Sequence, residues 1–348
     1  MLSLYRSMMT GFLASALGGF LVAGRPQELG ELRHVPRQVL AFYYPWYGNP
    51  RITGHWVHWS GVDESRKTIA AATHYPLLGA YDSHDARTVD QHVRWAKQAG
   101  ITGFIVSWWG QHDFSDEALP LLLNEAQRYG LKITIYYETV PARAFSKQKG
   151  TLSDLAYLRG RYFSHPAWLT VNGQPVVFIY GRAISQLGVR GWENLARDLS
   201  RQPLPPLLIA DNLSSEAAAA FAGVHEYSIT DRTHGKSPAE LQQWAGKEFT
   251  RLATIGGAGT IHSVTIIPGY DDRKLSRPQP RPITDRWNGE TYRTLWRAAL
   301  EAAPDWILIS TWNEWHEGSE IEPSIESSDR ELKTTSEFAR RFLAFHGD

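Results

Sequence analysis

The chain has 348 residues, which suits one α/β barrel with long loops or two ordinary domains. Its 36 basic and 36 acidic residues balance, so no bulk field attracts it to nucleic acid or acidic lipid, and we expect no nucleic-acid partner. The absence of cysteine excludes disulfides, thiolate metal sites and a cysteine nucleophile.

The amino terminus has the pattern of an export signal. Residues 8–23 are small or apolar and uncharged, they follow Arg6, and small residues occupy 22–24. We predict a signal peptide or an uncleaved signal anchor over residues 1–24, and a polar linker over 25–37. The apolar stretch is short and glycine-rich for a membrane span, which favours cleavage. We therefore expect an exported protein, periplasmic or secreted, that is membrane-bound only if this segment is retained as an anchor.

From residue 38 to the end, apolar runs typical of strands alternate with amphipathic stretches typical of helices. The predicted strands are 39–44, 103–108, 132–138, 175–180, 207–212, 225–229, 263–268 and 306–311. The predicted helices are 86–99, 116–129, 153–163, 191–201, 215–221, 238–256 and 290–302. Eight such units predict a single (β/α)8 TIM barrel with extended βα loops over residues 38–348. No glycine-rich dinucleotide turn follows the first strand, which disfavours an open doubly wound sheet.

Aromatic residues gather where these strands end, which is the face that carries the chemistry of barrel enzymes. The chain contains 14 Trp, and such rings either fill a core or stack on the apolar faces of sugars. The aromatic candidates for sugar contact are Tyr44, Trp46, Trp108, Tyr180, Tyr227 and Tyr270. Aromatic platforms beside carboxylates indicate a carbohydrate-binding site.

The carboxylates of the last strand end are the candidate catalytic pair. Glu314 and Glu317 are three residues apart, so one helical turn or tight loop turns both to the same side. Each carboxylate raises the proton affinity of the other, and the flanking tryptophans lower the local dielectric, so one carboxyl stays protonated near neutral pH. The alternative is a solvated surface pair. We include the neighbouring Trp312 and Asn313 as substrate contacts, and Glu138, which ends the third strand, as a carboxylate that binds sugar hydroxyls.

The histidines of the first long loop raise the question of a metal. His55, His58, His74 and His84 match no familiar ligand spacing, and we expect His58 to hydrogen-bond substrate rather than bind a metal. Neither a P-loop nor a serine-hydrolase elbow is present in the sequence. We therefore expect neither a metal nor another cofactor.

Four segments resemble glycoside hydrolase family 99, which holds endo-α-1,2-mannosidases and endo-α-1,2-mannanases. They are AFYYPWYGNP at 41–50, SWW at 107–109, PGY at 268–270 and WNEWHEGSEIEP at 312–323. The match runs in order through most of the chain after the signal, and the last motif is highly specific. The resemblance implies a (β/α)8 barrel that cleaves α-mannosides internally and retains the anomeric configuration.

The resemblance also implies roles for individual residues and a partner. Glu314 is implied to take the proton of the sugar 2-hydroxyl, which forms a 1,2-anhydro sugar, and Glu317 to serve as general acid and then general base. Glu138 matches a carboxylate near the substrate, Trp108 matches a stacking ring, and Tyr44 and Tyr227 match further contacts. The implied partner is α-mannan or a mannose-containing oligosaccharide.

Departures from the family pattern leave the substrate open. The third strand reads YYETV at 136–140, where the family has a segment of the type HIEPY, and SWW replaces the common SWY. These positions fall where sugar subsites are expected. Two alternatives therefore remain, which are hydrolysis of another α-glycan and a domain that binds glycan or assists polysaccharide assembly.

Overall fold

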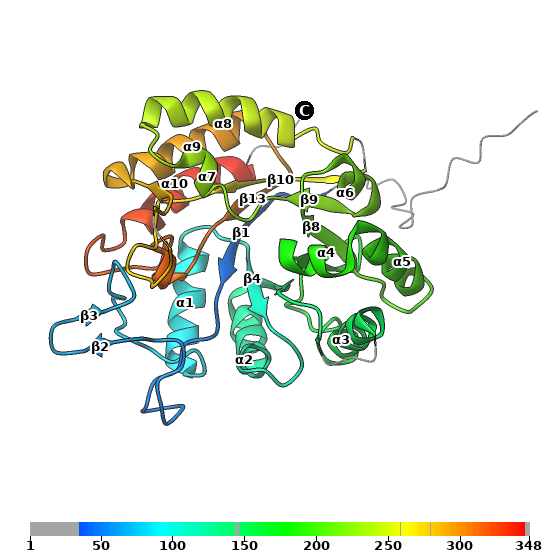
Figure 1. Ribbon diagram of the computed structural model, residues 1–348, viewed down its shortest axis with the longest axis horizontal. Helices are drawn as coiled ribbons and strands as arrows, with labels where there is room; N and C mark the ends of the chain where they lie inside the picture. The colour runs from blue at the N-terminus through cyan, green and yellow to red at the C-terminus, as the bar shows by residue number, and fades with distance from the viewer. Residues whose placement is uncertain (1–34, 143–145, 258, 279, 345–348) are drawn as a thin grey trace, which may run out of the picture.

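The computed structural model describes residues 35–142, 146–257, 259–278 and 280–344, which form one barrel surrounded by helices (Figure 1). The predicted signal segment 1–24 and most of the predicted linker lie outside the described residues. Among those described, no helix is long and apolar enough to cross a membrane.

Eight parallel strands close into the barrel, as predicted. They are β1 (Gln38–Tyr43), β4 (Gly103–Trp108), β5 (Lys132–Tyr137), β7 (Gln174–Ile179), β8 (Leu207–Asp211), β9 (Gly223–His225), β10 (Ile261–Ile266) and β13 (Trp306–Ile309). They pair in chain order, and β1 closes the ring by pairing with β13. Short pairs decorate the loops: β2 (Val62–Asp63) with β3 (Thr68–Ile69), β6 (Thr170–Val171) on β7, and β11 (Tyr270–Asp271) with β12 (Ile283–Thr284).

Helices cover the outside of the barrel (Figure 1). The predicted ones correspond to α1 (Ala86–Gln98), α2 (Phe114–Tyr129), α3 (Lys147–Arg161), α5 (Val189–Ser200), α6 (Ser215–Ala220), α8 (Pro238–Leu252) and α9 (Glu290–Ala302). The structure adds α4 (Gly181–Leu187), α7 (Thr230–Thr233) and α10 (Arg330–Ala344), which we did not predict. Capping residues fix the ends of several helices: Asp85 caps the start of α1, Gly130 ends α2 in the left-handed conformation, and Ser237 with Glu240 forms a capping box at the start of α8.

The alternation of side chains along each strand divides the core into two layers. In β1, Leu40 and Phe42 point into the barrel, whereas Val39, Ala41 and Tyr43 pack against the helices. Because successive residues of a strand face opposite sides, this parity continues beyond the strand end into the loop. The parity therefore decides which loop residues face the barrel mouth.

The sixth strand differs from its predicted position. We expected residues 225–229, but β9 is Gly223–His225. A Cβ at Gly223 would lie 2.7 Å from the Ile261 carbonyl oxygen, so this strand approaches β10 too closely for any residue but glycine. Glycine weakens a strand pattern in sequence, which is why the start of this strand was missed.

Candidate active site

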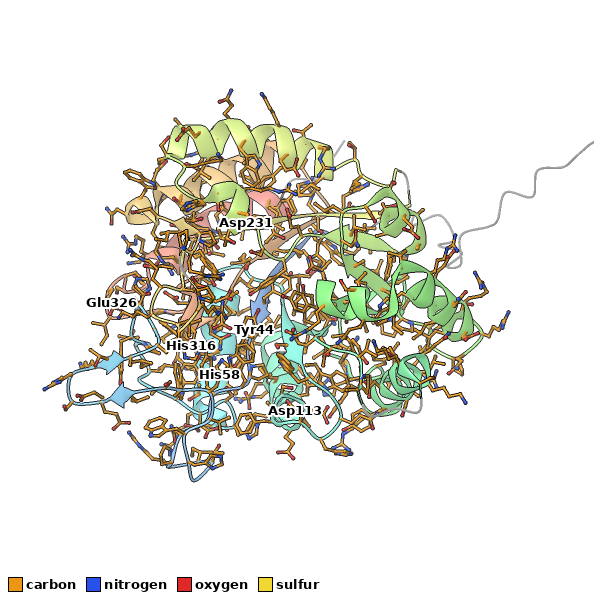
Figure 2. The ribbon with its side chains drawn as sticks, viewed as in Figure 1. Tyr44, His58, Asp113, Asp231, His316 and Glu326 are labelled. Atoms are coloured by element: carbon orange, nitrogen blue, oxygen red, sulfur yellow. The ribbon has the colours of Figure 1, made fainter. Side chains whose placement is uncertain are left out.

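A cavity of about 300 Å³ opens at the carboxyl ends of the strands. Its lining is Tyr44, Trp46, His58, Trp109, Tyr136, Glu138, Tyr180, Arg182, Tyr227, Arg277, Glu314 and Glu317. Eight of these residues were predicted from the sequence, and they come from the loops after β1, β5, β7, β9 and β13. Tyr44, His58 and His316 lie close together near the middle of the molecule (Figure 2).

Strand parity explains how most of this lining is positioned. Tyr44 continues the inward series of β1, and Glu138 follows the inward Tyr136 of β5. Tyr180 in the same way follows the inward Phe178 of β7. The barrel interior below them is filled by aromatic and aliphatic side chains, so the cavity has an apolar floor.

Glu314 caps the start of a single turn of 3-10 helix, η2 (Trp315–Glu317), and Glu317 is its last residue. Such a helix has three residues per turn, so residues three apart are eclipsed on the same side. Both carboxyls therefore face the cavity, while Trp315 is fully buried behind them. The Glu314 carboxylate also caps the turn by accepting the His316 backbone N–H at 3.2 Å, which fixes its orientation.

The surroundings of the pair favour the protonated state. The Glu314 side chain is 6% exposed, and burial together with the neighbouring Glu317 raises its pKa well above the usual range. Burial also raises the pKa of Glu317, although the guanidinium of Arg277, 3.6 Å away, opposes this. One of two such carboxyls can retain a proton near neutral pH while the other is ionised, as paired acid and base catalysis requires.

A third carboxyl stands across the cavity. Glu138 accepts a hydrogen bond from the Ser107 hydroxyl at 2.7 Å and is paired with Arg182 at 3.3 Å. Burial raises its pKa to about 7, against the opposing effects of Ser107 and Arg182. The Arg182 guanidinium in turn lies over the Trp109 ring, 4.7 Å from its centroid. This side of the cavity thus offers an aromatic plane and hydrogen-bonding groups together, as a sugar subsite needs.

Two tyrosines form the side of the cavity between the carboxyls. The Tyr44 hydroxyl donates to the Tyr227 hydroxyl at 2.5 Å. Burial and the nearby carboxylates raise the pKa of both phenols well above their usual value, so both remain neutral hydrogen-bonding groups. They supply polar contacts of fixed position without adding charge.

Asn313 holds the loop after β1 against the loop after β13. Its side-chain amide accepts from the Tyr44 backbone N–H at 2.7 Å and donates to the Tyr44 carbonyl at 3.0 Å. It also donates to the Tyr81 hydroxyl, which donates to Glu322. Glu322 also accepts from Trp315 and is bonded to the buried His92. This buried network positions the residues on either side of it, Tyr44 and Glu314.

Four predicted substrate contacts lie outside this cavity. Asn313 and Trp312 are fully buried, and Trp312 packs in the outer core against Phe104. Trp108 is 1% exposed, and its indole N–H donates to Asp116 at the start of α2. Tyr270 lines a neighbouring hollow of about 220 Å³. Trp108, Trp312 and Asn313 are therefore structural residues behind the site, and the stacking role expected of Trp108 does not fit its position.

Four residues of the lining were not predicted: Trp109, Tyr136, Arg182 and Arg277. Parity could have identified two of them, because Trp109 follows the inward Ile105 and Ser107 of β4, and Tyr136 is an inward residue of β5. Arg182 lies in the first turn of the unpredicted short helix α4, and Arg277 lies in the long loop after β11. Nothing in the sequence links either arginine to the barrel mouth.

The histidines beside the pair carry no charge at neutral pH. His58 as a whole residue is exposed, but desolvation of its ring, which stacks on Trp46, and the neighbouring His316 lower its pKa to about 3. Burial lowers the pKa of His316 to about 4. Each offers a ring nitrogen close to Glu314, and this is the group among residues 35–344, as far as they are described, that could hold a metal ion. The predicted hydrogen-bonding role of His58 toward substrate stays a prediction.

The comparisons with known proteins agree with this geometry. Residues 35–336 match the profile of glycosyl hydrolase family 99. The glycoprotein endo-alpha-1,2-mannosidase of Xenopus laevis is 27% identical over 84% of this chain and 71% of its own length, and that of Rattus norvegicus is 28% identical over 86% and 70%. The solved structure of a GH99 endo-alpha-mannosidase from Bacteroides thetaiotaomicron superposes with a TM-score of 0.71 at 26% identity, covering 89% of this chain and 98% of that one. The chain belongs to glycosyl hydrolase family 99 and is a glycoside hydrolase with an endo-α-mannosidase-like barrel.

Proposed function

We propose that this enzyme cleaves internal α-mannosidic linkages of mannan or mannose-containing glycans with retention of configuration. The observation that carries the proposal is the pair Glu314 and Glu317, which face one aromatic-lined cavity with raised pKa values. The names of the relatives, which are endo-α-1,2-mannosidases, support the choice of sugar. The cavity is open, and about 300 Å³ accommodates a sugar ring or two of a longer chain.

Glu314 and Glu317 act in two steps in this proposal. The Glu314 carboxylate removes the proton of the 2-hydroxyl as that oxygen attacks the anomeric carbon. The bond to the leaving oxygen breaks at the same time, and Glu317 protonates that oxygen. The now ionised Glu317 then takes a proton from water, which opens the 1,2-anhydro ring at the anomeric carbon, and Glu314 returns its proton to the 2-oxygen. Two inversions give net retention, and one water is consumed.

We also propose that the protein is exported. The proposal rests on the uncharged apolar stretch 8–23 and the small residues after it. An amino-terminal sequence of the cell-expressed protein that begins near residue 25, in the periplasm or the medium, would support it. A chain that retains residue 1 in the membrane fraction would instead indicate an anchor.

The test of the function is hydrolysis of an α-1,2-branched mannan by the purified enzyme and by Glu314→Gln and Glu317→Gln. General acid or base groups contribute about 10²- to 10⁴-fold, so each variant should lose at least about 100-fold in rate. A mannobiosyl fluoride, whose leaving group needs no protonation, should restore more of the rate of Glu317→Gln than of Glu314→Gln. The exposed Glu301→Gln serves as the matched control and should keep full activity.

The products separate this proposal from the alternatives. Oligosaccharides of retained configuration from mannan, lost in both variants, would establish it. Release from another α-glycan alone would keep the hydrolase and change the sugar. A folded protein that binds glycan without cleaving it would favour a binding or assembly role. A stable glycosyl ester on a carboxylate of the protein would refute the anhydro-sugar route.

A further inference from the structure

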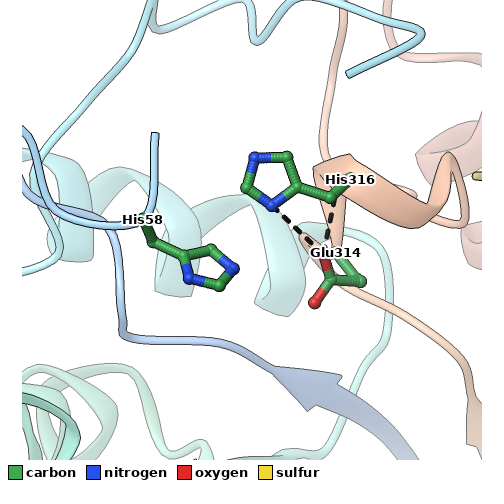
Figure 3. A group of neighbouring side chains, drawn as sticks. All are labelled: His58, Glu314 and His316. Atoms are coloured by element: carbon green, nitrogen blue, oxygen red, sulfur yellow. Dashed lines mark hydrogen bonds and ion pairs between the residues drawn. The ribbon is translucent and has the colours of Figure 1, made fainter. Parts of the chain in front are cut away.

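A second property of the site comes from three side chains beside the catalytic turn: His58, Glu314 and His316 (Figure 3). Each turns one nitrogen or oxygen toward a common space, and these three atoms lie within 4.8 Å of one another. His316 Nδ1 is 3.9 Å from Glu314 Oε1, too far for a hydrogen bond. In tetrahedral zinc sites two ligand atoms are separated by about 3.4 Å, so small side-chain movements would bring all three to one ion.

Each of the three groups has an acceptor atom that receives no hydrogen bond from the described residues. The His58 ring makes no hydrogen bond to any described residue, and it is held in place by stacking on Trp46, 4.0 Å between ring centroids. The His316 Nδ1, which faces Glu314, makes no hydrogen bond to a described residue and lies 3.9 Å from Glu314 Oε1. Glu314 Oε2 also has no hydrogen bond from a described residue. Groups oriented by packing with free lone pairs are preorganised for a ligand.

We propose that His58, Glu314 and His316 form a binding site for a borderline divalent metal ion such as Zn²⁺. Two imidazoles and one carboxylate are a donor set that zinc accepts, with water as the usual fourth ligand of such sites. Mg²⁺ and Ca²⁺ prefer all-oxygen sites of six or more ligands and would not be held here. His58 is an exposed residue at the edge of the cavity, which gives the ion a path from solvent.

Occupation of this site inhibits the enzyme, a conclusion that rests on the proposed function. A metal bound to the Glu314 carboxylate occupies the electron pair that would accept the proton of the sugar 2-hydroxyl. The ion also fills the side of the cavity between His58 and the catalytic turn. Metal and substrate therefore exclude one another, and zinc should act as a competitive inhibitor that a chelator reverses.

Binding is measured first, without reference to activity. Chelator-treated, untagged protein is titrated with Zn²⁺ by calorimetry and with Co²⁺ by its visible absorption. We expect a site of one ion per chain, with no binding of Mg²⁺ or Ca²⁺. Loss of a ligand should cost no less than the tenfold to 100-fold typical of an outer-shell partner, so His58→Ala should weaken the affinity at least about tenfold. His55→Ala, an exposed histidine three residues earlier, is the matched control and should bind as the wild type does.

The two halves of the proposal fail separately. Zinc affinity that is unchanged in both His58→Ala and His316→Ala, with folding checked by circular dichroism, overturns the site. Zinc bound at His58 without any rise in the KM for mannan overturns the inhibition. If the enzyme cleaves none of the α-glycans offered, the proposed function fails, while the calorimetric comparison of the His58 and His55 variants still decides the metal site.

Discussion

Replacement of Asn313 by alanine should lower the free energy of unfolding by about 2 to 6 kcal/mol. The variant leaves the Tyr44 backbone N–H and carbonyl without their partner, in a residue that is 5% exposed. A buried polar group left unsatisfied costs about 1 to 3 kcal/mol, and there are two of them. The loss of the bond to Tyr81 and the small cavity left behind add to this figure.

Chemical unfolding followed by tryptophan fluorescence measures this change. The control is Asn194→Ala, because Asn194 is exposed on α5 and its side chain accepts a hydrogen bond from the nearby Arg197, so its replacement should change the free energy of unfolding by no more than about 0.5 kcal/mol. A loss of less than about 1 kcal/mol for Asn313→Ala would refute the positioning role. Unchanged stability with a raised KM would instead restore the direct substrate contact that we first predicted for Asn313.

Two further predictions concern the cavity and the tryptophans beside it. Burial raises the pKa of Glu138 to about 7, above its unfolded value, so the folded wild type loses stability as the pH rises through that range. The stability of Glu138→Gln relative to wild type, measured by chemical unfolding, should therefore increase by up to about 3 kcal/mol between about pH 5 and pH 8. No change with pH would contradict the burial argument. Trp108→Phe should lower the free energy of unfolding by about 1 to 3 kcal/mol, because it loses the hydrogen bond to Asp116, and should keep the wild-type kcat/KM. Trp109→Ala, whose ring lines the cavity, should lower kcat/KM at least about tenfold. The reverse pattern would show that the two adjacent rings were assigned wrongly.

The barrel could be predicted because its strands are defined by buried apolar runs of regular spacing. The unpredicted helix α4 spans seven residues and starts at Gly181, and α7 spans four. Elements this short have no periodicity that sequence can show, since they form because tertiary contacts hold them. The strand predicted at 225–229 was misplaced because tertiary contact also decides its start: the close approach to β10 requires glycine at 223, and glycine does not predict a strand.

In the site, residue type alone does not predict which side chains face the cavity, but the alternation of side chains along a strand does so in most cases. Trp108 is the last residue of β4 and Trp109 follows it, and chemistry alone cannot choose between the two tryptophans. The alternation of the strand turns Trp108 outward and Trp109 to the cavity. The same rule would have turned Trp312 inward, after Trp306 and Leu308, yet it packs in the outer core. The rule fails there because the sheet ends at Ile309 and the chain then turns through irregular structure.

The chemistry of the site conflicts with the stability of the fold that holds it. An acid that stays protonated near neutral pH requires burial, and burial of Glu317 and Glu138 makes their ionised forms costly to the folded chain. Arg182 beside Glu138 and Arg277 beside Glu317 offset part of this cost by their charge. The network of buried hydrogen bonds around Asn313 forms a frame that holds the surrounding loops together. A change that loosens this frame admits water to the cavity, which lowers the pKa of both carboxyls toward their ordinary values. Replacements in the hydrogen-bond network around Asn313 should therefore lower activity even though the catalytic carboxyls are intact.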